Sequence, residues 1–361
     1  MQHRISKIVL TGGPCAGKTT ALARIVEHFA GMGYHVYTVP EAATLFAGAG
    51  VDFLTKDNDL FLESERQLLA FQMELEDRME RIAARQHGPA LIVCDRGTMD
   101  LKAYMTEAQW QELLAEGSFS LVGLRDARYD AVIHMATAAK GAEQYYTLAN
   151  NAARSETPEA ACAIDDKLIA AWTGHPHLRV VGNDCTFDEK MGRVLREIAH
   201  VLGVPQPIEI ERKYLVEQVA DIPGANTCDI LQTYLLPIDG QEQRLRRRGQ
   251  DGHYVYFLTK KIRLGPDRNY EHEQQISEKR YTELLTQTNP EKQPIHKQRT
   301  CFVWQNQYFE LDCFLQPRMT HLLLEIEDAA SPDEVHMPPF LKVIEDVTGN
   351  PDYSNSNIAR R

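Results

Sequence analysis

The stretch IEIERKYL, residues 208–215, has the alternation of a β-strand. Side chains two residues apart on a strand share a face, so Glu209, Glu211 and Lys213 are expected to project together. Adjacent carboxylates repel each other unless a cation lies between them, and hard divalent ions prefer carboxylate oxygens. The stretch therefore predicts a strand that holds a divalent ion beside an anionic ligand.

The same alternation recurs along the C-terminal half with either sign of charge. The rows are Arg244, Arg246 and Arg248; Thr259 and Lys261; Glu271 and Glu273; Lys297 and Arg299; Glu310 and Asp312; Glu325 and Glu327. A single pair is typical of a solvated strand face, but burying the whole set in an ordinary core would be costly. We therefore expect a hydrated interior in which basic rows bind a polyphosphate and acidic rows bind the divalent ions that bridge it.

Residues from about 206 to 355 resemble the CYTH domains, also called triphosphate tunnel metalloenzymes. The signature of that family, Glu-x-Glu-x-Lys on the first strand, stands here as Glu209, Glu211 and Lys213, and the later rows match in order. The resemblance implies an α+β fold with an antiparallel tunnel of eight strands, a bound triphosphate and Mg²⁺ or Mn²⁺. Many members hydrolyse inorganic triphosphate, nucleoside triphosphates or thiamine triphosphate, and some make cyclic AMP.

Inside such a tunnel the acids are expected to hold metal and the bases to hold phosphate, because arginine can bind phosphate with two parallel hydrogen bonds. The expected metal ligands are Glu209, Glu211, Glu273, Asp312, Glu325 and Glu327. The expected phosphate contacts are Arg244, Arg246, Arg248, Lys261, Lys297 and Arg299. Glu211 and Lys213 are the expected catalytic pair in this half.

The N-terminal half carries a phosphate-loop pattern, Gly-x4-Gly-Lys-Thr, between an apolar strand (7–11) and a helix expected over 20–32. The loop residues are Gly12, Gly13, Pro14, Cys15, Ala16, Gly17, Lys18, Thr19 and Thr20. In this pattern backbone amides and a helix N-terminus surround phosphate oxygens. Lys18 is expected to neutralise the β- and γ-phosphates of ATP or GTP, and Thr19 to ligate Mg²⁺. Cys15 is interpreted as a small loop residue rather than a catalytic thiol.

Two other strand ends supply further candidates. An apolar run ends at Asp95, after an amphipathic helix expected over 63–86, and Asp95 is expected to orient Mg²⁺ through water or else to cap a helix. Arg96 resembles the arginine of the Asp-Arg pair in thymidylate kinases, which reaches a substrate phosphate; an ion pair that ties down the loop is the alternative. Glu41, at the end of a strand over 36–40, is the candidate general base, with a helix cap as its alternative.

A polar segment, 139–159, contains Arg154 and is interpreted as a lid over the phosphates, or alternatively as a disordered insertion. A fifth strand, 178–183, ends at Asn183, where kinases of this kind cradle the nucleotide base. The first half therefore resembles the phosphate-loop kinase-like ATPases related to the ribosylnicotinamide kinase domain of bacterial NAD regulators, which are AAA-ATPase-like. That resemblance implies an α/β fold with a doubly wound parallel sheet of five strands. It leaves the phosphoryl acceptor open.

Length and composition agree with two domains. The chain has 361 residues with 43% hydrophobic content, and the break is expected at two prolines near 203–207, giving domains 1–204 and 205–361. The net charge of −12 argues against non-specific nucleic-acid binding. The lack of a long apolar run predicts a cytoplasmic protein without integral membrane association. The seven cysteines show no Cys-x2-Cys spacing, and the pair His175 and His177 is more typical of a surface loop than of a metal site.

Two functions are consistent with these motifs. In the first, the N-terminal half is a phosphotransferase with an unknown small or lipid-derived acceptor, and the tunnel binds or hydrolyses a triphosphate. In the second, the N-terminal half is a nucleotide switch and the tunnel is a non-catalytic sensor of polyphosphate or phosphoinositide. The candidates Glu41, Arg96 and Arg154 favour the enzyme. The sequence leaves the oligomeric state open.

Overall fold

The computed structural model describes residues 5–145, 157–204, 208–209, 211–238, 241–263, 269–327 and 332–360. The chain divides into two compact units, Met1–Ile198 and Ala199–Arg361. Arg154 lies outside the described residues, and Glu209 and Glu271 are described by their backbone alone. Within the described ranges, no helix has both the length and the apolar character needed to cross a membrane.

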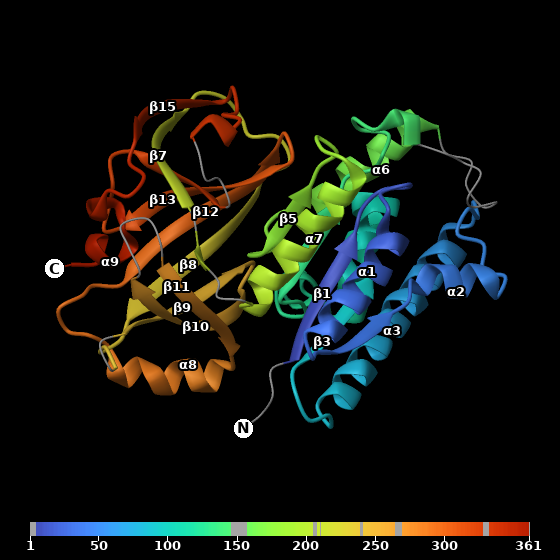
Figure 1. Cartoon of the computed structure of the whole chain (residues 1–361), viewed down its shortest axis with the longest axis horizontal. Helices are drawn as coiled ribbons and strands as arrows, with labels where there is room; N and C mark the ends of the chain where they lie inside the picture. The colour runs from blue at the N-terminus through green and yellow to red at the C-terminus, as the bar shows by residue number, and fades with distance from the viewer. Residues whose placement is uncertain are drawn as a thin grey trace. The chain divides into compact units, whose positions relative to one another are not determined.

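The first unit is built on a five-stranded sheet in the order β2-β3-β1-β4-β5, with helices packed around it (Figure 1). Its strands are β1 (Ile5–Thr11), β2 (His35–Val39), β3 (Ala90–Asp95), β4 (Ala131–Met135) and β5 (Leu178–Val181). Its helices are α1 (Lys18–Gly31), α2 (Ala42–Gly48), α3 (Asn58–Ala83), α4 (Glu107–Gly117), α5 (Leu121–Arg125), α6 (Pro158–Trp172) and α7 (Phe187–Leu202), with short 3₁₀ turns η1 (Thr98–Tyr104) and η2 (Glu143–Tyr145). Every strand pair is parallel, which confirms the predicted five-stranded parallel sheet.

The local sequence explains where these elements lie. β1, β3 and β4 are almost wholly buried, as continuous apolar runs in a parallel sheet should be. α3 begins at Asn58, earlier than predicted. The Asp57 side chain accepts hydrogen bonds from the backbone N–H groups of Asp59 and Leu60, which have no partner within the helix. The strands are parallel, so all of their carboxyl ends lie at one edge of the sheet, where α/β folds bind ligands.

The second unit is a ten-stranded sheet in the order β15-β7-β14-β13-β12-β8-β9-β10-β11-β6. Its strands are β6 (Ile208–Glu209), β7 (Glu211–Gln218), β8 (Asn226–Tyr234), β9 (Glu242–Gln250), β10 (His253–Arg263), β11 (Asn269–Ile276), β12 (Ile295–Trp304), β13 (Gln307–Gln316), β14 (Leu322–Glu327) and β15 (Leu341–Asp346). Its helices are α8 (Glu278–Leu284) and α9 (Asn355–Ile358), with 3₁₀ turns η3 (Leu285–Gln287), η4 (Pro332–Glu334) and η5 (Pro351–Tyr353). α8 lies against β10 (Figure 1).

All pairs in this sheet are antiparallel. The first two strands along the chain, β6 and β7, lie near opposite ends of the strand order. β6 pairs with β11, and β7, which begins two residues after β6 ends, pairs with β14 on one edge and β15 on the other. The sequence predicts eight strands. The sheet has ten strands. The first predicted strand corresponds to two, β6 and β7, and β15 adds a further strand along β7.

The two faces of this sheet differ in chemistry. One face carries an apolar cluster in which Phe302, Phe309, Leu324 and Tyr214 are each at most 5% exposed. The intervening residues of the same strands carry the charged rows. This alternation is the period-two pattern of a strand that separates two environments.

One prediction about the neighbourhood of the first sheet is wrong. His175 was expected on a surface loop, but it is fully buried, and its Nε2 lies 3.0 Å from the carbonyl oxygen of Tyr129. Burial lowers the pKa of His175 to about 3, so the ring is neutral. Its ring also packs edge-on to Trp172. The residue is therefore part of the core.

The apolar face of the second unit gives a stability prediction. Phe309 is fully buried and its ring stacks on that of Phe302 at 5.3 Å. Phe309→Ala should lower the free energy of unfolding of this unit by about 3–5 kcal/mol, because it leaves a cavity in a packed core. Urea unfolding followed by circular dichroism measures the change, with Val343→Ala, at a 41% exposed position, as the control. A loss no larger than that of the control would contradict this account of the core.

Candidate functional site

The phosphate loop joins β1 to α1 at the carboxyl edge of the first sheet. Gly12 has φ 142°, and a Cβ there would lie 2.1 Å from the carbonyl oxygen of Met135. Gly17 has φ 90° and leads directly into α1, which starts at Lys18 rather than at the predicted Thr20. Both positions require glycine, one for space and both for conformation. The two fixed glycines of the sequence pattern are thus those that shape the loop.

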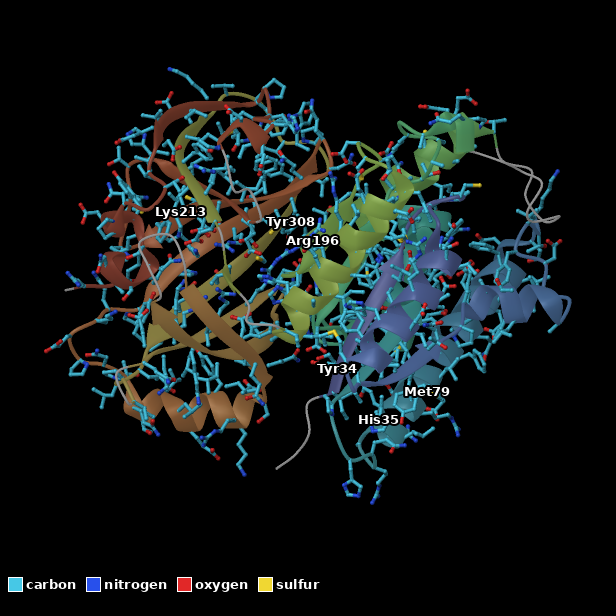
Figure 2. The ribbon with its side chains drawn as sticks, viewed as in Figure 1. Tyr34, His35, Met79, Arg196, Lys213 and Tyr308 are labelled. Carbon is cyan, nitrogen blue, oxygen red and sulfur yellow. The ribbon has the colours of Figure 1, made fainter. Side chains whose placement is uncertain are left out.

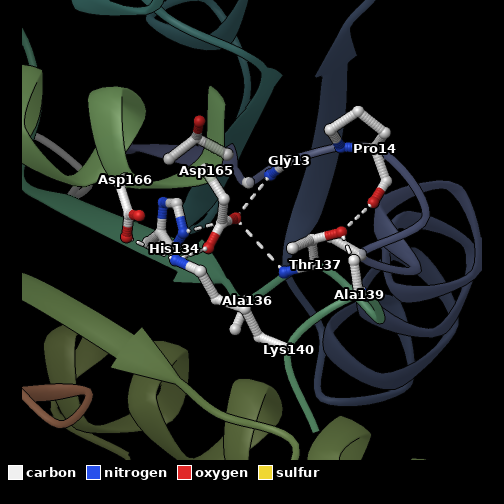
Figure 3. A network of polar contacts seen from close by, with 12 residues as sticks. Gly13, Pro14, His134, Ala136, Thr137, Ala139, Lys140, Asp165 and Asp166 are labelled. Atoms are coloured by element: carbon white, nitrogen blue, oxygen red, sulfur yellow. Dashed lines mark hydrogen bonds and ion pairs between the residues drawn. The ribbon is translucent and has the colours of Figure 1, made fainter. Parts of the chain in front are cut away.

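A buried carboxylate on α6 holds this loop in place (Figure 3). Asp165 accepts hydrogen bonds from the N–H groups of Gly13 at 2.9 Å and Thr137 at 3.2 Å, and lies 3.0 Å from His134 Nε2. Lys140 Nζ donates to its other oxygen at 2.9 Å. Burial would raise the pKa of Asp165, but His134 and Lys140 hold it well below its usual range. The loop is therefore anchored to a permanently charged group.

A buried lysine provides a second anchor. Lys190 Nζ, on α7, donates to the carbonyl oxygens of Ala16 at 3.2 Å and Ala136 at 2.7 Å, and to Asn183 Oδ1 at 2.6 Å. Burial lowers the pKa of Lys190 to about 8. The Asn183 amide in turn donates to the carbonyl oxygens of Thr137 and Lys140. Asn183, predicted to cradle the base, is thus occupied in supporting the loop.

Lys18 and Asp95 lie at the mouth of the loop. Lys18 Nζ donates to the carbonyl oxygen of Gly12 at 2.8 Å. Burial, together with Arg96, lowers the pKa of Lys18 to about 8, and burial raises the pKa of Asp95. Asp95 Oδ1 is buried and has no hydrogen-bond partner among the described residues. An unsatisfied carboxylate oxygen of this kind fits the water shell of a divalent cation, and Thr19 is exposed at the first turn of α1.

Glu41 and Arg96 form an ion pair at the ends of β2 and β3. Arg96 Nε lies 2.5 Å from Glu41 Oε1, and Thr44 Oγ1 donates to Glu41 Oε2 at 2.7 Å. Burial would raise the pKa of Glu41, but Arg96, Thr44 and Lys18 lower it. Glu41 takes the N-cap position of α2 without a side-chain capping bond. The ion pair that the sequence left as an alternative for Arg96 is the contact that the structure shows.

The remaining loop residues have simple placements. Pro14 offers its carbonyl oxygen to the Thr137 hydroxyl. Cys15 is half-buried with φ 57°, in the left-handed region. Thr20 is exposed on α1. None of these positions contradicts the phosphate-loop interpretation, which depends on backbone geometry more than on these side chains.

In the second unit, the strand registers place the predicted charged residues on one face, named here the charged face. Cross-strand partners share a face. Its members are Glu211, Lys213, Arg244, Arg246, Arg248, Thr259, Lys261, Glu273, Lys297, Arg299, Glu310, Asp312, Glu325 and Glu327. Glu209 occupies a register position on the same face through its pairing with Asn269. The sequence rows therefore converge on one surface of the sheet.

Arg299 is the centre of the acidic part of the charged face. Its guanidinium donates to Asp312 at 2.7 and 2.6 Å, to Glu325 at 2.6 Å, and to Glu310. Arg299 is only 5% exposed, yet Asp312 and Glu310 raise its pKa further above the usual range against the effect of burial. Three carboxylates from two neighbouring strands thus share one guanidinium.

Two lysines flank this cluster. Lys297, fully buried, contacts Asp312, and Lys213 Nζ contacts Glu325 at 2.8 Å and Glu211 at 3.2 Å. Burial would lower the pKa of Lys213, but Glu211 and Glu325 raise it. These lysines therefore contact carboxylates that the sequence had assigned to metal.

The basic part of the charged face has fewer carboxylates. Arg246 contacts Glu273 at 3.2 Å, and the Thr259 hydroxyl donates to the same carboxylate at 2.7 Å. Arg246 Nε is buried without a hydrogen-bond partner among the described residues. Gln232, its cross-strand partner, is fully buried, and neither of its amide atoms has a partner in the described part of the chain. Arg248 NH2 lies 3.7 Å from Cys301 Sγ.

The predicted metal ligands do not form a ready cluster. Glu211 and Glu327 are direct cross-strand partners, but Glu325 faces Lys213 instead. Among the described residues, no group of three or more His, Cys, Asp or Glu side chains is arranged to hold a metal ion. Glu211 and Glu327 are thus the two predicted metal ligands that the register places directly opposite each other.

The sequence missed the residues that support these sites. Asp165, Lys190 and Gln232 carry no motif, and the contacts of Asp165 with Gly13 and of Lys190 with Ala16 join segments that are far apart along the chain. The signal that could have found Asp165 is a lone acid inside the otherwise apolar buried face of a helix. Such an acid requires a partner, since burying an unpaired carboxylate is costly.

Asp165 gives a direct test of the loop anchor. Asp165→Asn should lower the free energy of unfolding by about 3 kcal/mol at pH 7, because it leaves Lys140 without its buried partner. The native pKa is depressed, so the wild-type advantage is present above the unfolded value of about 3.9 and is lost progressively as the pH falls through the native pKa, so that only part of it is lost at pH 3. Denaturant unfolding at pH 7 and pH 3 measures both effects. Asp166→Asn, at a 70% exposed side chain that also contacts Lys140, is the control and should change little.

Residues 7–190 match the AAA domain family. Similar solved structures include the hypothetical protein NE1496 (31% identity, covering 42% of this chain and 97% of that one) and the inorganic triphosphatase NE1496 (30% identity, 42% and 93%), each with a TM-score of 0.31. The PH1012 protein of Pyrococcus horikoshii OT3 is 21% identical, with coverage of 35% and 82% and a TM-score of 0.28. At these TM-scores the likeness by itself establishes neither fold nor activity.

No curated protein matches the chain. The match to the AAA domain family carries more weight than the structural likenesses, because it spans more than half of the 361 residues. It also contains the whole phosphate loop and both of its anchors, Asp165 and Lys190. The chain therefore belongs to the AAA domain family.

Proposed function

We propose that the first unit is a Mg²⁺-dependent phosphotransferase that binds ATP or GTP at the loop 12–20 and transfers the terminal phosphoryl group to a small acceptor. The observation that supports this most strongly is the unsatisfied Asp95 oxygen beside Lys18 at the carboxyl edge of a parallel sheet. A site built only to stabilise the fold would satisfy that oxygen. A site built to receive a hydrated cation leaves it open.

Each side chain has a distinct task in this proposal. Lys18 would exchange the Gly12 carbonyl for phosphate oxygens, since its Nζ already lies at the loop. Mg²⁺ held by Thr19 and, through water, by Asp95 would neutralise charge on the phosphates. Glu41, kept ionised by its lowered pKa, would accept the proton of an acceptor hydroxyl once Arg96 turns toward the transferred phosphoryl group. The predicted lid residue Arg154 would add a further positive charge.

For the second unit we propose a closed tunnel that binds a triphosphate. The pairing of β6 with β11 and of β7 with β14 supports closure by eight strands, with β15 outside the ring. The buried, unpartnered Gln232 amide and Arg246 Nε support a polar ligand or water on the charged face. Arg244, Arg248 and Lys261, on the same face, would complete the basic wall.

The observed ion pairs suggest which residues of that tunnel would bind phosphate and which would bind metal. Lys297 and Arg299 are held by carboxylates, so they would bind phosphate only after exchanging these partners. Glu211 and Glu327 would hold Mg²⁺ or Mn²⁺ on the opposite side of the ligand, with Glu209, Glu273, Asp312 and Glu325 as the other proposed acids. A divalent ion held by these acids would neutralise charge on the phosphates and would lower the pKa of a bound water for hydrolysis.

The sensor alternative is supported by one observation: the carboxylates around Arg299 are paired with basic side chains rather than left open for a metal. A tunnel that only senses polyphosphate needs tight binding and no activated water. Incubation of the full chain with inorganic triphosphate and Mn²⁺ separates the two functions. Release of inorganic phosphate supports the enzyme, and saturable binding without release supports the sensor.

The loop lysine is the first residue to vary. Lys18→Ala should reduce phosphoryl transfer or nucleotide hydrolysis about 100-fold, corresponding to about 3 kcal/mol of lost transition-state stabilisation. Triphosphate binding by the second unit should not change. Equilibrium binding of a fluorescent ATP analogue and radiometric turnover measure the loss, with Lys56→Ala, at an exposed position, as the control. Wild-type nucleotide affinity and turnover in Lys18→Ala would contradict the assignment of Lys18 to the phosphates of the nucleotide.

The tunnel acid provides the matching test in the second unit. Glu211→Gln should weaken Mn²⁺ binding and any triphosphate hydrolysis at least tenfold, or about 1.4 kcal/mol, because an amide is a poorer ligand for a hard cation. Calorimetry with Mn²⁺ and triphosphate measures this on the full chain. Glu217→Gln, on the same strand with a 53% exposed side chain, should behave as wild type. Equal effects of the two substitutions would show that the charged face is structural.

A further inference from the structure

The buried side of α3 carries three polar residues among its apolar contacts. Glu65, Gln72 and Glu76 are 4%, 3% and 0% exposed. At 3.6 residues per turn all three point within about 40° of one another around the helix axis. They therefore form one polar line directed at the sheet and at the space beyond its edge.

Two members of this line have structural partners. Glu76 accepts hydrogen bonds from Arg128 and Tyr129. Gln72 donates to Glu76 at 2.9 Å and lies 3.4 Å from the carbonyl oxygen of Arg96. Both residues are thus accounted for by packing against the strand ends.

Glu65 is different. It has no hydrogen-bond or ion-pair partner in the described part of the chain. Burial alone raises the pKa of Glu65 to about 7, and no charged side chain contributes to the shift. A leucine at this position would be more stable than a buried carboxylate without a partner. A costly, perturbed acid beside a ligand-binding edge is the kind of group that serves binding.

The topology shows what Glu65 faces. α3 connects β2 to the parallel strand β3, so it runs antiparallel to the strands and begins at their carboxyl edge. Gln72 is level with Arg96, just past the end of β3. Glu65 is seven residues earlier, about 10 Å further out along the same side of the helix. The helix rise therefore places Glu65 beyond the level of Arg96, on the same buried side of α3 as Gln72.

We propose that Glu65 forms the far wall of the acceptor site and binds a hydroxyl or amino group at the end of the acceptor away from Arg96. This inference rests on the proposed phosphotransferase function. The acceptor class is a small polyol or amino alcohol: one hydroxyl receives the phosphoryl group beside Glu41, and a second hydrogen-bond donor reaches Glu65. Acceptors that end in a phosphate or an alkyl group lack the donor that Glu65 requires.

The test compares wild type, Glu65→Gln and Glu65→Leu as full chains. They are incubated with γ-labelled ATP and GTP and a defined panel: ribose, inositol, sorbitol and a linear amino alcohol of matched length, beside a linear mono-alcohol and sorbitol 6-phosphate. We expect transfer only to members with a free distal donor. Glu65→Leu should raise the KM for the accepted member at least tenfold, with kcat changed less than threefold and ATP affinity unchanged.

The other variants identify the donor. Glu65→Gln should keep the KM of a hydroxyl donor within about threefold, because its amide oxygen still accepts a hydrogen bond, and should lose an amine donor, which needs the negative charge. Glu63→Gln, on the exposed side of the same helix, is the matched control and should behave as wild type. An unchanged KM in Glu65→Leu overturns the inference and leaves the phosphotransferase intact. Bound ATP without transfer to any panel member overturns both.

A stability measurement excludes a purely structural role. The native pKa of Glu65 is raised above the unfolded value of 4.5, so its favourable contribution is present below that pH and is lost as the pH rises through about 7. The difference in melting temperature between Glu65→Gln and wild type should therefore be more positive at pH 8 than at pH 5. A variant that is destabilised at both pH values would show that Glu65 has a structural partner, and would overturn the inference.

Discussion

The phosphate loop of this protein depends on one buried carboxylate. Asp165 binds the backbone N–H of Gly13 inside the loop and that of Thr137 after β4, and so fixes the loop against a neighbouring strand end (Figure 3). A loop that must present its amides to an anion cannot also satisfy them internally, so its shape has to be held from behind. Lys190 does the same for the carbonyl groups. Opposite charges on α6 and α7 thus hold the two kinds of backbone group.

The second unit solves a related problem with side chains. Its charged face brings together many ions, and in its acidic part the carboxylates of β13 and β14 are paired with basic side chains of β12 and β7. Lys213 shows this arrangement: it lies on β7 (Figure 2) and contacts Glu211 on its own strand and Glu325 on β14. The opposite face of the same strands is apolar and supplies the stability. Period-two alternation therefore serves folding on one face and ligand chemistry on the other.

The sequence predicted those features that arise from local patterns. The glycines at 12 and 17 and the rows of alternating charge are local, and the structure places them in a strand–loop–helix junction and on one sheet face. The anchors are not local: Asp165 meets Gly13 across 152 residues, and no short pattern encodes such a contact. His175 shows the opposite case. A histidine between small and polar residues indicates an exposed loop, but the ring of His175 is buried by contacts that the local sequence does not reveal. The parallel sheet was predictable, whereas the residues that hold its loops required the tertiary structure.

In both units the basic side chains expected to bind phosphate already contact oxygen atoms of the protein. Lys18 is held by a loop carbonyl, Arg96 by Glu41 and Arg299 by Asp312, so a phosphorylated ligand would exchange partners rather than bind to free charges. The exchange limits the net gain in affinity, because each contact formed replaces one that is lost. It also protects buried charges from remaining unpaired. The exceptions are therefore informative: Asp95 Oδ1, the Gln232 amide and Glu65 have no partner to exchange among the described residues. A ligand that satisfies them gains the most, and specificity should concentrate at these three positions.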